Sequence, residues 1–148
     1  MPLRIRSRLD LGFCVSVLTL ITDTPKVCST AFFKKEAKSI FSGLIKVEEE
    51  AQHTDAYQTN RNLLLSAEAE ADSLPGLEIL ANEVKCSHGA TTSRIDPQEL
   101  FYLRSRGVPM LEAEKLIALG FLRECLDGIT HQETRERAFK TLENSFMK

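Results

Sequence analysis

Short apolar runs separated by polar residues fill the middle of the chain, from Ser39 to Ile95. They are rich in the β-branched and aromatic residues that strands favour. The runs predict strands at 39–47, 57–65, 77–81 and 84–90, with turns at Asp72-Ser73, Pro75-Gly76 and Gly89. No helical period separates them, so the pattern excludes alternating β and α units. It leaves a sandwich, a barrel and a stacked β-solenoid open.

The pattern changes to helix at Asp96. The sequence Asp96-Pro97-Gln98-Glu99 is typical of a helix N-terminus, and Gly107 suits the end of that helix. Pro109 opens a second helix over 110–126, whose apolar surface is wider than a one-sided helix needs. That helix therefore packs between two layers or offers one face to another protein. A second capping box, Thr130 to Glu133, predicts a third helix.

The first 25 residues fit neither pattern. The apolar run from Leu11 to Ile21 follows three arginines, as in a secretory signal, but Asp10 interrupts and no small-x-small cleavage site follows. Alternation of Val15 and Val17 favours a β-strand, and an export signal stays open as the alternative. We therefore predict an unassigned N-terminal segment, a β domain and a helical domain at 1–25, 26–95 and 96–148.

Composition narrows the class of protein. The chain has 148 residues, 43% of them hydrophobic and 27% charged, which is typical of a globular domain. Its net charge is −2, with +5 in the first 47 residues and −7 in the rest, so no overall basic field predicts a nucleic-acid partner. No apolar run reaches the ~18 residues that a membrane span needs. Four scattered cysteines without a C-x-x-C motif predict reduced thiols in a cytoplasmic protein.

Most motifs of catalysis are absent from the sequence. It contains no phosphate-binding G-x-x-x-x-G-K-[ST] loop, no G-x-S-x-G and no H-E-x-x-H. Cys86 and His88 stand two residues apart in a predicted strand, so both side chains should project from one face. A thiolate and an imidazole suit iron or zinc, although other ligands would have to complete the site. A buried thiol beside a hydrogen-bonded histidine and a Cys–His nucleophile remain alternatives.

Six stretches between Ala37 and Ile129 resemble the C-terminal part of the SufD family. This family belongs, with SufB, to the SUF iron–sulfur cluster assembly machinery. The most specific stretches are the Val84-Lys85-Cys86-Ser87-His88-Gly89-Ala90-Thr91 strand and the helix from Leu100 to Gly107. The others are 39–43, 54–58, 62–66 and 77–79.

The resemblance implies a fragment of a right-handed parallel β-helix followed by a C-terminal helical domain. It also implies a non-ATPase scaffold subunit, not an enzyme, that pairs with a SufB-like subunit and docks the ATPase SufC. His88 corresponds to the family histidine at the SufB–SufD interface, where it would share a metal with the partner chain, and Cys86 would have a weaker role. Transient iron or a nascent iron–sulfur cluster would be handled there, with no cofactor held stably by this chain alone. By the same resemblance the SufC-docking tail comprises Phe101, Tyr102, Arg104, Arg106 and Phe121.

The chain also departs from the family. Family members are far longer, and nearly all of the β-helix that precedes this region in them has no counterpart here. An alternative is therefore a truncated, non-functional fragment that retains only SufC binding. A solenoid beginning here would also expose the edge of its first coil, which favours self-association.

Overall fold

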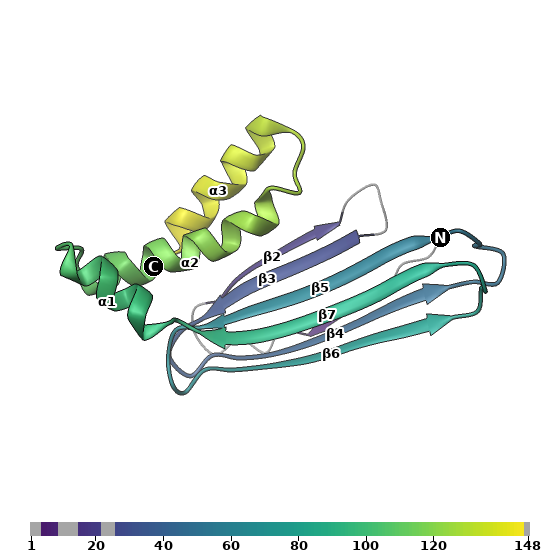
Figure 1. Cartoon of the computed structure of the whole chain (residues 1–148), viewed down its shortest axis with the longest axis horizontal. Helices are drawn as coiled ribbons and strands as arrows, with labels where there is room; N and C mark the ends of the chain where they lie inside the picture. Colours follow the sequence, from purple (N-terminus) through teal and green to yellow (C-terminus); the bar gives the residue numbers. More distant parts are fainter. Residues whose placement is uncertain (1–3, 9–14, 22–25, 147–148) are drawn as a thin grey trace.

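Two β-sheets followed by three helices make up the fold (Figure 1). The computed structural model describes residues 4–8, 15–21 and 26–146. The described strands are β1 (Arg4–Arg8), β2 (Val15–Ile21), β3 (Lys26–Phe33), β4 (Lys38–Val47), β5 (Asp55–Leu64), β6 (Glu70–Ile79) and β7 (Lys85–Arg94). The helices are α1 (Pro97–Ser105), α2 (Met110–Leu126) and α3 (Gln132–Phe146). One sheet has the order β1-β4-β6 and the other β2-β3-β5-β7.

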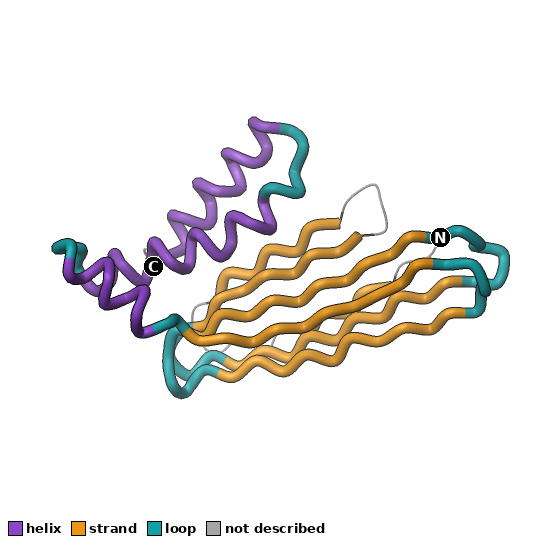
Figure 2. Tube along the Cα trace, in the orientation of Figure 1, coloured by secondary structure: helices purple, strands orange, loops and turns teal. Residues whose placement is uncertain are grey.

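From β3 onward the chain winds alternately between the two sheets. β3, β5 and β7 pair in parallel in one sheet, and β4 and β6 pair in parallel in the other. Figure 2 shows the strands in two layers, with the helices on the side of β2 and β3. The predicted order of a β region followed by helices is confirmed, whereas the handedness of the winding stays a prediction.

The first two strands of the winding, β3 and β4, each pair with a strand from the N-terminal part of the chain. β1 lies antiparallel on β4, and β2 lies antiparallel on β3. The expectation of an exposed first coil is therefore wrong, because the N-terminal residues supply a strand to each sheet. The predicted strand in the apolar run is confirmed for Val15–Ile21, while the rest of that run, 11–14, lies outside the described residues.

The turns expected around Pro75 are wrong, because these residues lie inside β6. The backbone N–H of Glu70 donates to the Ala37 carbonyl and that of Leu80 to the Val47 carbonyl, both at 2.9 Å. Even-numbered positions of β6 thus bond to β4, and odd-numbered positions face away from it. Pro75 occupies an odd position, so its missing N–H removes no hydrogen bond from the ladder. Gly89 likewise lies inside β7.

The helices begin largely where local signals predict. Asp96 Oδ1 accepts the backbone N–H of Gln98 at 2.8 Å, and Gly107 has the positive φ of +85° expected after a helix end. The predicted cap at Thr130 is wrong by one residue. His131 precedes the first helical residue, and its Nδ1 accepts the Thr134 N–H at 3.4 Å.

Apolar contacts form three clusters. Two lie between the sheets, one at each end of the strands, and a third joins the outer face of β3 and β5 to α2 and α3. The third contains Phe32, Leu63, Ala118, Leu122, Leu126 and Leu142. The inner two contain Ala31, Phe33, Ala37, Leu64 and Ala69, and Ile45, Val47, Ala56 and Ala81. Polar side chains fill the space between the inner clusters.

Candidate functional site

The candidate site lies at the open edge formed by β6 and β7. Among the described strands each of these two pairs on one side only. The N–H of Lys85 donates to the Thr54 carbonyl at 2.8 Å, so odd-numbered positions of β7 bond to β5. Even-numbered positions, Cys86 and His88 among them, therefore direct their backbone N–H and C=O groups to the open side. Such an edge is a template for a strand of another chain.

Cys86 and His88 share one face of β7. In the parallel register they lie opposite Ala56 and Gln58, whose side chains are buried between the two sheets. The thiol of Cys86 packs beside the apolar cluster around Ile45, as expected for a half-buried thiol. The side chain of His88 is exposed at the edge. The two side chains that the strand pattern placed together are thus accessible from the open side.

Among the described residues, the site offers two metal ligands, Cys86 and His88. In the part of the chain that the structure describes, no group of three or more His, Cys, Asp or Glu side chains is arranged to hold a metal ion. Cys86 and His88 would therefore need ligands from another chain, from water or from a thiol. The roles of both residues stay predictions.

Gln58 is the feature of this region that sequence reasoning missed. Its side chain is 0% exposed, and neither amide atom has a hydrogen-bond partner among the described residues. It faces Gly43 of β4 so closely that a Cβ there would lie 2.0 Å from Gln58 Nε2. On β5 it is the register neighbour of His88. The available signal was a polar residue at an inward position of an alternating strand.

A polar network holds the two edge strands against β5. Asn60 Oδ1 accepts from Asn62 Nδ2 at 2.8 Å and from Ser73 Oγ at 2.6 Å. Asn62 Nδ2 also lies 3.4 Å from Thr92 Oγ1. These bonds join β5 to β6 in the opposite sheet and to β7 in its own sheet. The network therefore fixes the position of the edge that carries His88.

Three residues of the predicted docking tail, Phe101, Tyr102 and Arg104, lie on α1, which buries none of its side chains, and a fourth, Arg106, is the C-cap of that helix. Phe101 is 73% exposed and Tyr102 is 55% exposed. The guanidinium of Arg106 lies 4.7 Å from the centre of the Tyr102 ring, and Arg104 is exposed in the last turn. Sequence reasoning missed two exposed apolar side chains on α2, Met110 and Leu111, whereas Leu116, which is also exposed, belongs to the wide apolar surface predicted for that helix. α1 and the start of α2 thus carry several uncovered apolar side chains.

Phe121 does not join this surface. Its ring packs against the cluster between the sheet and the helices, and the Arg61 guanidinium lies 4.9 Å from the ring centre. Its contacts are those of a residue that attaches α2 to the sheet. Its role in docking stays a prediction.

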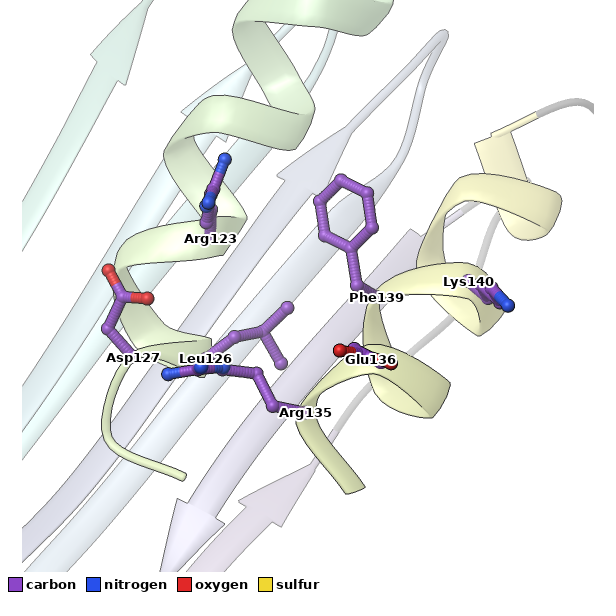
Figure 3. A pocket seen from close by; sticks show the side chains of 7 residues that line it. All are labelled: Arg123, Leu126, Asp127, Arg135, Glu136, Phe139 and Lys140. Carbon is purple, nitrogen blue, oxygen red and sulfur yellow. The ribbon is translucent and has the colours of Figure 1, made fainter. Parts of the chain in front are cut away.

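A hollow lies between the end of α2 and the start of α3 (Figure 3). Its lining combines apolar and oppositely charged side chains: Arg123, Leu126, Asp127, Arg135, Glu136, Phe139 and Lys140. Because both signs of charge are present, the lining favours no single class of ligand.

None of the described helices is long and apolar enough to cross a membrane.

Comparisons with known proteins match most of this chain to one family. Residues 22–121 match the family model described as "SUF system FeS cluster assembly, SufBD core domain". The iron–sulfur cluster assembly protein SufD of Escherichia coli is 42% identical over 102 residues, which cover 69% of this chain and 24% of that protein. An iron–sulfur cluster assembly SufBD family protein of Synechocystis is 48% identical over 93 residues, 63% of this chain and 20% of that protein. SufD of Bacillus subtilis is 37% identical over 110 residues, 74% and 25%.

The match is confined to part of these relatives. The chain spans between a fifth and a quarter of the length of the three named above. The family model nevertheless covers most of the chain, including the β6–β7 edge and α1. The chain therefore belongs to the SufBD family of the SUF iron–sulfur cluster assembly system.

Proposed function

We propose that this chain acts as a SufD-like scaffold subunit, without ATPase activity, in cytoplasmic iron–sulfur cluster assembly. It pairs with a SufB-like subunit through the β6–β7 edge and docks a SufC-like ATPase through its helices. The observation that carries the proposal is the position of Cys86 and His88 on one face of β7, which among the described strands pairs on one side only. The names of the E. coli and B. subtilis relatives supply the process.

Pairing through the edge follows from the hydrogen-bonding state of β6 and β7. Both strands end their sheets among the described residues, so a partner could extend the two layers together. Small side chains such as Ser73 and Ala90 leave room for a facing strand, and β6 also carries the exposed apolar side chains Leu74, Leu77 and Ile79. In this proposal the winding is the last part of a right-handed parallel β-helix, and the partner continues its sheets.

His88 and Cys86 would hold iron or a nascent cluster transiently at this interface. The ion or cluster is cargo that passes through the site, and the SufB-like chain supplies the ligands that this chain lacks. An exposed imidazole suits this exchange, because it can bind and release without rearranging the core. Cys86, half-buried beside apolar side chains, has the weaker role.

Replacement of His88 tests the metal role. We expect His88→Ala, studied in the assembled complex, to lower cluster formation measured by visible absorbance, with subunit pairing unchanged. His53→Asn is the matched control, because His53 is an exposed histidine with a positive φ of 61° that asparagine tolerates. Cluster formation by His88→Ala equal to that of the control would refute the role of His88.

Replacement of Ala90 tests pairing separately. Ala90 lies at an even position of β7, so Ala90→Pro removes an N–H from the open side without breaking a bond to β5. We expect loss of co-purification with the SufB-like subunit, with an unchanged melting temperature. Ala90→Ser is the control, since it keeps the N–H. Undiminished pairing of Ala90→Pro would contradict edge addition.

A second candidate function is ATPase docking alone. The exposed apolar side chains of α1 and α2 would suffice for such docking. A pull-down with both partners separates the two functions. Capture of the SufC-like ATPase without the SufB-like subunit would support docking alone.

A further inference from the structure

A cleft on the outer face of the β3-β5-β7 sheet brings two thiols together. It lies between that face and the C-terminal end of α2. Charged, phenolic and thiol side chains line it, among them Lys26, Cys28, Tyr57, Arg61, Glu124 and Cys125. This face is opposite the one that carries Cys86 and His88. The cleft is therefore separate from the edge site and does not depend on the proposed function.

Cys28 and Cys125 are in contact although they are 97 positions apart in the chain. The Cys125 thiol donates to the Cys28 carbonyl oxygen, with its Sγ 3.6 Å away, and Cys28 Sγ lies 3.6 Å from Thr30 Oγ1. Neither belongs to a disulfide. Cys28 is half-buried on the cleft wall, whereas Cys125 is 4% exposed. One thiol of the pair is thus open to small solutes, and the other lies behind it.

The neighbouring groups shift the pKa values of the two thiols in opposite directions. The hydrogen bond from Cys125 lowers the pKa of Cys28 to about 6, and Thr30 and Arg61 also lower it while burial and Glu124 raise it. The hydrogen bond to Cys28, together with burial, raises the pKa of Cys125. The two shifts therefore favour a thiolate at Cys28 beside a neutral thiol at Cys125.

Contacts of Arg61 with the C-terminal half of α2 hold that helix, and with it Cys125, against the sheet. Arg61 of β5 forms an ion pair with Glu124 and lies over the Phe121 ring on the same helix. These contacts flank Cys125 on α2 and keep its thiol against β3. A low-pKa, accessible thiolate next to a second thiol is the arrangement found in cysteines that react with oxidants.

We propose that Cys28 and Cys125 form a peroxide-reactive dithiol site that closes a disulfide between β3 and α2. The Cys28 thiolate attacks one peroxide oxygen, so an S–O bond forms, the O–O bond breaks and the other oxygen leaves as water or an alcohol after taking a proton. Cys125 then attacks the Cys28 sulfur, the S–S bond forms, and the hydroxyl leaves with the Cys125 proton as water. Two electrons pass from the two sulfurs to the peroxide. The product covalently joins the sheet to the helical part of the chain.

Oxidation of the full chain with hydrogen peroxide tests the site. The reduced protein is treated at pH 7, blocked with N-ethylmaleimide and digested with trypsin. We expect a peptide in which residues 27–34 and 124–135 are linked through Cys28 and Cys125, in wild type and in Cys86→Ser alike. In Cys125→Ser the link should be absent and a sulfenic acid at Cys28 should be trapped by dimedone.

A second measurement needs no variant and covers the case in which Cys125→Ser fails to fold. Wild-type protein is labelled with substoichiometric iodoacetamide at pH 7, and Cys28 should be alkylated at least tenfold faster than Cys86. Equal labelling of the two cysteines would overturn the proposal. So would peroxide oxidation that leaves no 27–34 to 124–135 link while oxidising Cys86 or other side chains.

Discussion

Gln58 provides the sharpest test of the packing described above. Its amide is fully buried without a hydrogen-bond partner among the described residues, and burying an unsatisfied polar group costs about 1–3 kcal/mol. Methionine has nearly the same length and no polar amide. We therefore expect Gln58→Met to raise the free energy of unfolding of the isolated chain by about 1–3 kcal/mol. In urea this would move the midpoint upward by on the order of 1 M.

The assay is urea unfolding followed by circular dichroism. Gln98→Met is the matched control, because Gln98 is exposed on α1 and such surface changes usually stay within about 0.5 kcal/mol. A Gln58→Met chain that is less stable than wild type would refute the reasoning. It would mean that the amide forms hydrogen bonds that outweigh the cost of its burial.

Two further predictions concern neighbouring close contacts. Gly43→Ala would place a Cβ 2.0 Å from Gln58 Nε2, so it should destabilise the chain by about 1–3 kcal/mol, and Gln58→Ala should relieve part of that loss in a double-mutant cycle. Alkylation of Cys28 should titrate with a midpoint near pH 6, and in Cys125→Ala the midpoint should move up toward the ordinary thiol value. Because the folded-state pKa is depressed, ionisation of Cys28 adds stability as pH rises from about 6 to 9, and this contribution is lost as pH falls through 6. An unchanged midpoint in Cys125→Ala would refute the role of that hydrogen bond.

Features that depend only on residues a few positions apart can be predicted well from the sequence. The cap at Asp96, the proline at the first helical position and Gly107 after the last turn act within a few residues, so the sequence contains the whole signal. The shared face of Cys86 and His88 follows from the two-residue period of any strand. The local signal at the start of α3 is ambiguous, because Thr130 and His131 both offer a hydrogen-bond acceptor. In the structure His131, not Thr130, caps the helix.

Features that depend on distant segments could not be predicted. Pro75 signals a turn locally, and only the pairing with β4 shows that its missing N–H faces an open edge. Cys28 and Cys125 meet because α2 packs across β3, which no local motif encodes. The covering of the first coil by β1 and β2 likewise depends on long-range pairing.

The amide of Gln58, which has no hydrogen-bond partner among the described residues, lies beside the edge strand β7. We expect an apolar side chain at this position to stabilise the chain, yet an amide stands there, in register with His88 and against a glycine that leaves space for it. The neighbouring inward positions hold Asn60 and Asn62, so the interior beside the edge is polar along several residues of β5. If this polarity serves the interface, Gln58→Met should make the isolated chain more stable and still lower cluster formation in the assembled complex. A variant that is more stable and fully active would show that the amide only costs stability.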